Sequence, residues 1–160
     1  MKIIKRINEL LNGILFKIAD FVVFIASVCL VFSISIQVFA RYVLNKSPRW
    51  TTEFACFSLV FLVFWGSSIA LKKGLHIEID TTKYKLPKRV LNVFRIISSI
   101  SIYFFCIIII YYGALITINN SQSLSEAMKI PYSYIYINVP ICGFLMLIGY
   151  TDKLLNSISK

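Results

Sequence analysis

The sequence predicts an all-α integral membrane protein with four transmembrane helices, an N-terminal amphipathic interfacial helix and both termini in the cytoplasm. Hydrophobic residues make up 58% of the 160 residues, above the roughly 45–50% of a soluble domain. The charged residues leave four long uncharged stretches, each close to or above the roughly 18 residues that mark a membrane-spanning helix. Backbone groups in lipid must be hydrogen-bonded within their own segment, so these stretches are predicted to be helices. We expect one membrane domain, residues 1–160, with transmembrane helices at 21–40, 54–71, 96–118 and 132–151.

The distribution of positive charge orients these helices. The formal net charge is +10, and 13 of the 17 basic residues lie before the first span, between spans two and three, or after span four. The positive-inside rule therefore places both termini and the 72–95 loop in the cytoplasm. This basic side also attracts phospholipid headgroups. Nucleic-acid binding, which such a charge would suggest in a soluble protein, is the weaker interpretation beside four membrane spans.

Residues 1–19 have the pattern of an amphipathic helix. Apolar residues such as Ile3, Ile7 and Ile14 recur at three- and four-residue steps, and basic residues occupy much of the remaining surface. We expect this helix to lie in the cytoplasmic membrane interface. The alternative, an extension of the first span into the cytosol, would expose the apolar stripe to water.

The connection between the first two spans, residues 41–53, is a short charged island between apolar runs. Arg41, Arg49, Trp50 and Glu53 stand there, and we hypothesise that they serve docking or anchoring on the outer face. Glu53 can pair with Arg49, four residues before it, or with Arg41 across the loop. The alternative is that the arginines mark the membrane edge and that Trp50 belongs to an aromatic belt.

The second span and the loop after it contain three further candidates. Gly66 and Ala70 are four residues apart, a spacing that lets helices approach closely in lipid. They are predicted to contact a partner subunit or to pack the four helices together. The 72–95 loop holds His76, which is predicted to be a pH-sensitive contact, a bond to a partner subunit, or a loop histidine satisfied by Glu78, Asp80 or backbone. After Pro87 the loop becomes helical in pattern and predicts a second interfacial segment.

The fourth span has a proline at each of two distinct places. Pro131 precedes the helix, and Pro140 lies inside it. Since the ring of Pro140 removes a backbone donor, we expect a kink there.

The chemistry of transport or catalysis is missing from the predicted spans. They contain no Asp, Glu, Lys, Arg or His, the residues that usually mark ion and proton pathways. The four cysteines stand one per span without a C-x-x-C pair, which favours packing over metal or redox roles. No phosphate-binding loop or hydrolase motif is present. We therefore predict no enzyme activity, no catalytic residue, no metal site and no cofactor.

Three segments resemble the small membrane subunit of the tripartite ATP-independent periplasmic (TRAP) transporters. They are RYVLNKSPRWTTE at 41–53, WGSSIALKKGLHIEID at 65–80 and KIPYSYIYINVPICG at 129–143. The sequence departs from the family pattern at Thr52 and Cys56, where a second Glu and an Arg are frequent. The positions that match the pattern are Arg41, Trp50, Glu53, Gly66, Gly74, His76, Ile77, Asp80, Pro131, Pro140 and Gly143.

The resemblance implies a multi-pass protein of the bacterial inner membrane with two protein partners. A large TRAP membrane subunit would form an obligate heterodimer with it and would hold the sodium and substrate sites. A periplasmic substrate-binding protein would dock transiently and deliver an organic acid, such as sialic acid or a dicarboxylate. This chain would be the scaffold and part of the docking surface, with no substrate site of its own. The alternative is a self-sufficient small four-helix transporter that acts as a homo-oligomer.

Overall fold

The computed structural model describes residues 2–46, 48–74 and 88–158 and confirms the all-α prediction. Its helices are α1 (Lys2–Tyr42), α2 (Arg49–Lys73), α3 (Lys88–Asn119), α4 (Ser133–Tyr136) and α5 (Asn138–Ile158). Over the described residues, four helical segments are long and apolar enough to cross a membrane: Gly13–Tyr42, Arg49–Lys73, Ile96–Asn119 and Ser133–Leu154. No strand forms in the described ranges, where an isolated antiparallel bridge joins Leu124 to Pro131.

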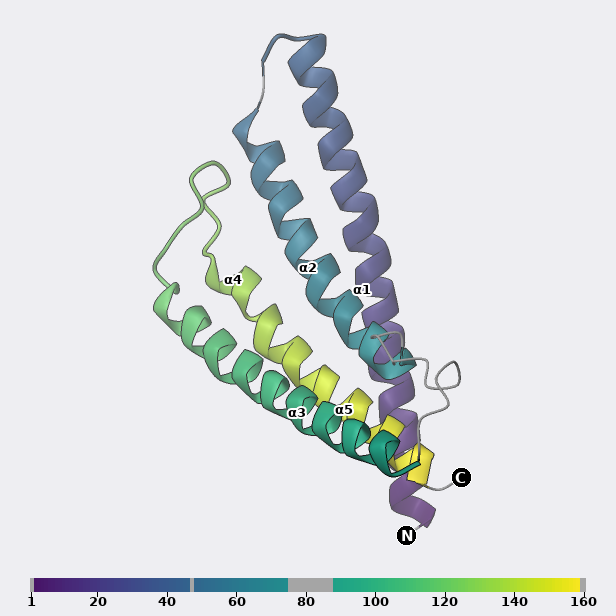
Figure 1. Cartoon of the computed structure of the whole chain (residues 1–160). Coiled ribbons are helices and arrows are strands. Elements are labelled where there is room, and N and C mark those ends of the chain that lie inside the picture. The colour runs from purple at the N-terminus through teal and green to yellow at the C-terminus, as the bar shows by residue number, and fades with distance from the viewer. Residues whose placement is uncertain (1, 47, 75–87, 159–160) are drawn as a thin grey trace.

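The helices form an open row and not a closed bundle. α1 packs on α2, α2 on α5, and α5 on α3, so α1 and α3 are the two edges of the row. Figure 1 shows two antiparallel pairs, α1 with α2 and α3 with α5, which diverge toward one end. We call this the loop end, because residues 43–48 and 120–132 connect the helices there. The pairs converge at the opposite end, the terminal end, where both chain termini lie (Figure 1).

The first helix is longer than the first predicted span. α1 is one helix of 41 residues, so the N-terminal amphipathic segment and the first span are continuous. A helix lying in the membrane plane would need a break before the chain turns into the membrane, and α1 has none. The helix is therefore continuous, and the position of its N-terminal segment relative to the membrane surface stays a prediction.

The fourth span is broken one turn before Pro140. α4 ends at Tyr136 and α5 begins at Asn138, which places Pro140 in the first turn of α5. A proline is tolerated there because the first backbone donors of a helix have no partner within it. The side chain of Asn138 supplies hydrogen bonds across the break. Its amide donates to the carbonyls of Tyr134 and Ile135, at 3.3 and 3.0 Å.

Three glycines bring neighbouring helices close together. A Cβ on Gly113 of α3 would lie 3.1 Å from the backbone nitrogen of Pro140, and one on Gly143 of α5 would lie 2.8 Å from Ile110. A Cβ on Gly149 would lie 2.8 Å from the Phe16 ring and 3.2 Å from Cβ of Lys72, where α1, α2 and α5 meet. Small residues allow such approaches in lipid, where apolar surface alone does not drive helices together.

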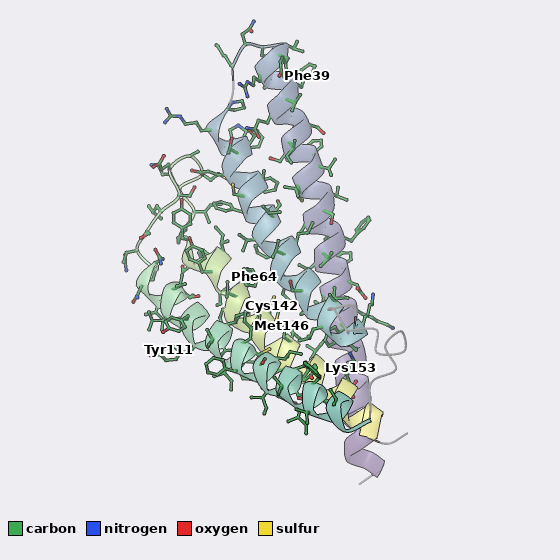
Figure 2. The ribbon with its side chains drawn as sticks, viewed as in Figure 1. Phe39, Phe64, Tyr111, Cys142, Met146 and Lys153 are labelled. Atoms are coloured by element: carbon green, nitrogen blue, oxygen red, sulfur yellow. The ribbon has the colours of Figure 1, made fainter. Side chains whose placement is uncertain are left out.

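Apolar side chains cover the outer surface of the row. Phe39 on α1 and Tyr111 on α3, both labelled in Figure 2, are 59% and 62% exposed. Cys142 and Met146 lie instead at the interface of α5 with its neighbours (Figure 2) and are buried. Cys106 is buried with Met146 in the same cluster. An exposed apolar perimeter of this extent is suited to a lipid solvent.

Candidate functional site

The carboxylate of Glu53 holds the loop that precedes α4. Glu53 is in the first turns of α2, and its partners follow some 70 residues later in the chain. Ser125 Oγ donates to Oε2 of Glu53. The backbone N–H groups of Ala127 and Met128 donate to Oε1 and Oε2 at 2.9 and 3.0 Å. We call this set of bonds the Glu53 contact. It joins the α1–α2 pair to the α3–α5 pair at the end where the two pairs diverge.

The 120–132 loop is folded so that its donors point at Glu53. The Ser125 N–H donates to the Ile130 carbonyl at 2.9 Å, and the Tyr132 N–H donates to the Ser123 carbonyl at 3.0 Å. Lys129 adopts a left-handed φ of 55° to close the turn. Ser125 is fully buried, so its hydroxyl needs the partner that Glu53 supplies. Turn N–H groups aimed at a carboxylate form charge-assisted bonds, which are stronger than neutral ones.

The start of α2 is also tied to α1. Ser33 Oγ donates to the Thr51 carbonyl at 2.7 Å, and both residues are buried. Gln37 Nε2 donates to Thr52 Oγ1 at 3.0 Å. Thr52, where a second acidic residue is frequent in the pattern described above, thus has a neutral partner here. The first turns of α2 are held on one side by α1 and on the other by the loop.

A groove of aromatic character opens beside the Glu53 contact, between α2 and α4. Glu53, Phe57 and Tyr136 are among the side chains that line it. Tyr132 meets Phe57 edge-on at 6.2 Å between ring centroids and stacks on Tyr136 at 5.9 Å. The groove combines a carboxylate with three rings, but the carboxylate is already engaged by the loop.

The structure separates the charged residues of the 41–53 island. Arg41, Arg49 and Trp50 are exposed at the loop end. Glu53 turns toward the 120–132 loop, and no ion pair joins it to Arg41 or Arg49 within the described part of the chain. The two pairings considered from the sequence are therefore not formed. Basic and aromatic side chains remain free to face headgroups or a protein partner.

The other predicted residues have different surroundings. A Cβ on Gly66 would meet nothing within 4 Å, so no other described helix of this chain approaches Gly66 closely. Pro131 pairs with Leu124 at the base of the loop, and Pro140 lies near Gly113. His76 is outside the described residues. Gly74, just before it, ends α2 in a left-handed conformation, φ 70°, which glycine adopts without strain.

Two polar residues within the spans were not singled out from the sequence. Trp65 Nε1 of α2 donates to Oδ1 of Asn138 at 3.1 Å and so ties α2 to the break between α4 and α5. A polar amide beside a proline in an apolar run is a usable signal for such a contact. The sequence carries no comparable signal for Ser125, because serine is common in polar loops. Over the described residues, no group of three or more His, Cys, Asp or Glu side chains is placed to hold a metal ion.

Comparisons with known proteins agree on one family. Residues 30–160 match the family described as tripartite ATP-independent periplasmic transporters, DctQ component. The sialic acid TRAP transporter permease protein SiaT of Haemophilus influenzae is 26% identical over 151 residues, which are 94% of this chain and 23% of that protein. The sialic acid TRAP transporter small permease protein SiaQ of Vibrio cholerae is 23% identical over 126 residues, 75% of this chain and 69% of that protein. The chain thus spans under a quarter of the length of the first relative and over two thirds of the second.

Proposed function

This chain belongs to the DctQ component family of the tripartite ATP-independent periplasmic transporters, and from that premise we propose that it is a fixed scaffold for a larger transport subunit. The family is a transporter component and not an enzyme family. With its four candidate spans, the chain is a multi-pass membrane protein. The scaffold role, the bacterial inner membrane and the cytoplasmic position of the terminal end belong to the proposal.

The observation that carries the scaffold role is the open row of helices. Each helix packs mainly on its neighbours in the row, and the edge helices α1 and α3 leave broad apolar faces uncovered. No Asp, Glu, Lys, Arg or His lies between residues 54 and 71 or between 96 and 120, so these helices offer no charged pathway for an ion. A large membrane subunit with the substrate and sodium sites would supply the chemistry and cover part of this surface.

The length of one relative supports a larger partner. The match to the Haemophilus permease covers 23% of that protein, so there the equivalent of this chain is one part of a longer polypeptide. In our proposal, the remainder of the permease corresponds to a separate large subunit that binds this chain as an obligate heterodimer.

The loop end is the proposed contact for a periplasmic substrate-binding protein. The Glu53 contact fixes the shape of the 120–132 loop, and Arg41, Arg49 and Trp50 present charge and an aromatic ring beside it. Charges at the edge of an interface act mainly on the rate of encounter. Arg49→Glu should lower uptake roughly threefold to tenfold at limiting binding protein and leave membrane insertion unchanged. Full uptake by this variant would argue against docking through Arg49.

Sialic acid is the first substrate to test, because both relatives are named as sialic acid systems. In our proposal the substrate is an organic acid taken up with sodium, and its selection lies in the partner proteins and not in this chain.

The decisive experiment is affinity purification of the tagged chain from its native membranes in a mild detergent, with partners identified by mass spectrometry. We expect one large polytopic partner in equal amount. Recovery as a homo-oligomer without such a partner would contradict the scaffold role and favour a self-sufficient small transporter.

The Gly66→Leu variant tests the contact face in the same experiment, since Gly66 has open space around it in this chain. Loss of the partner without loss of the fold would place Gly66 and Ala70 in the subunit interface.

A further inference from the structure

A second groove lies at the terminal end, between α1 and α2. It is lined by Phe16, Lys17 and Asp20 of α1 and by Ile69, Lys72 and Lys73 of α2. On α1, Phe16 and Lys17 stand four and three positions before Asp20, and on α2, Lys72 and Lys73 stand three and four positions after Ile69, which places each set on one side of its helix. The groove is at the ends of two candidate membrane spans, one beginning at Gly13 and the other ending at Lys73. Its depth is that of lipid headgroups.

Two of the three lysines that line the groove, Lys17 and Lys73, are exposed. Asp20 reaches Lys73 at 3.8 Å, with both side chains more than half exposed, and such a pair contributes little stability. Lys72 is less exposed, and its Nζ lies 3.8 Å from the centroid of the Phe16 ring. Lys17 and Lys73 are therefore the groups that face an incoming anion.

An apolar track continues from the groove toward the loop end. On α1, Phe24 follows Asp20 by one turn and is 66% exposed. A phosphate at the lysines would thus sit at the end of an exposed apolar surface on α1.

We propose that this groove binds an anionic phospholipid. Lys17 and Lys73 hold the headgroup phosphate, and an acyl chain lies along Phe24 of α1. The lysine charges select the anionic headgroup, because basic residues near a membrane surface attract anionic lipids. The apolar track selects a lipid over a soluble phosphate, which would gain nothing from it.

The test uses Trp65 as a local reporter. Trp65 packs against the cluster of Phe16, Ala19 and Ile69, which borders the groove. The chain has two tryptophans, so Trp50→Phe leaves Trp65 as the sole source of tryptophan fluorescence. The full chain with this change is reconstituted in phosphatidylcholine vesicles that contain brominated phosphatidylglycerol or, at the same mole fraction, brominated phosphatidylcholine. Bromine quenches nearby tryptophan, and we expect stronger quenching by phosphatidylglycerol.

Charge removal at the two lysines should abolish this preference. Lys17→Gln with Lys73→Gln is expected to lower the relative affinity for phosphatidylglycerol about thirtyfold, roughly fivefold for each lysine. Lys17→Arg with Lys73→Arg should keep the preference, because the charge stays. The matched control is Lys46→Gln with Lys129→Gln, which removes the same charge from exposed lysines at the loop end and should change nothing.

Three results would overturn the proposal. One is equal quenching by the two brominated lipids in the unaltered groove. Another is an equal loss of the phosphatidylglycerol preference in the Lys46→Gln, Lys129→Gln control, which would show that the preference depends on the overall charge of the chain and not on the groove. The third is loss of the phosphatidylglycerol preference on addition of millimolar inorganic phosphate, which would mean that the lysines bind free anions and not a lipid.

Discussion

The two ends of the molecule are held together by different forces. At the loop end the helix pairs diverge, and the hydrogen bonds of Glu53 with the 120–132 loop join them. Within each pair, hydrogen bonds occur at both ends, such as Ser33 with the Thr51 carbonyl and Ser99 with Tyr150. At the terminal end the pairs converge on apolar clusters. Leu71, Cys106, Met146 and Tyr150 form one, and Phe16, Ala19 and Ile69 form the other.

This difference follows from the geometry of an open row in lipid. Lipid tails solvate apolar side chains as well as another helix does, so helices that are to touch need either close packing or polar bonds. Close packing is available at the terminal end, where Gly149 brings three helices together. Where the pairs diverge, a carboxylate with several donors fixes their relative position with little buried area. The relative position of the two helix pairs is thus fixed at the loop end by a few hydrogen-bonding atoms and at the terminal end by many packing contacts.

The largest effect is expected from breaking the packing at the terminal end. Gly149→Leu places a side chain where even a Cβ would lie 2.8 Å from the Phe16 ring and 3.2 Å from Cβ of Lys72. Overpacking of this kind costs about 1–3 kcal/mol. Unfolding in mixed detergent micelles, followed by circular dichroism, measures the loss.

Gly66→Leu is the matched control for that variant. It makes the same substitution inside a helix, with nothing within 4 Å of the new Cβ, and it gains the same helix propensity. We expect its stability to stay within about 0.5 kcal/mol of the parent chain. Equal destabilisation by the two leucines would show that the terminal end is not closely packed.

A more local effect is expected at the loop end from Glu53→Gln. The amide retains one acceptor oxygen but presents an NH₂ group to a site made of donors. Backbone amides of Ala127 and Met128 should then exchange hydrogen roughly tenfold faster, with the helices unchanged. Hydrogen exchange measured by mass spectrometry on the 120–132 loop provides the readout. Glu126→Gln removes the same charge from an exposed side chain of the same loop and should leave exchange as it was.

The membrane spans were easier to foresee from the sequence than the contacts between them. Length and apolar composition predicted the four spans, because a membrane fixes both quantities. The kink expected at Pro140 stays a prediction, since α4 and α5 are separated at Ile137 and Pro140 lies in the first turn of α5. Partners of Glu53 could not be deduced, since Ser125 and Ala127 lie more than 70 residues away in a polar loop and the order of the helices in the row was unknown.

The small residues illustrate the same limit. Gly66 and Ala70 have the spacing of a packing motif, yet the close approaches in this chain occur at Gly113, Gly143 and Gly149. Small residues four positions apart show that another helix could pack closely on this one. Whether a helix does so depends on the residues of the second helix, which the spacing does not reveal. For Gly66 no such partner lies within the described part of this chain.

An intermediate effect is expected midway between the two ends, at Trp65 and Asn138. Their hydrogen bond, 3.1 Å long, joins α2 to the break in span four. Asn138→Ala and Trp65→Phe, singly and together, form a double-mutant cycle. Side-chain hydrogen bonds between membrane helices average about 0.6 kcal/mol in such cycles, and we expect a coupling of that size in unfolding experiments. A coupling energy near zero would mean that Asn138 stabilises the fold only through its hydrogen bonds to the Tyr134 and Ile135 carbonyls.

The smallest effect on stability, and the sharpest contrast between the ends, is expected from Asp20→Asn. Asp20 and Lys73 are 3.8 Å apart with exposed side chains, and an exposed pair of this kind contributes about 0–1 kcal/mol. Unlike Glu53, Asp20 can therefore lose its charge with almost no change in unfolding. Its removal frees Lys73 for an anionic headgroup, so the phosphatidylglycerol preference reported by Trp65 should rise while stability stays constant. A clear loss of stability with an unchanged lipid preference would mean that the charges of the terminal end, like those of the loop end, serve the fold itself.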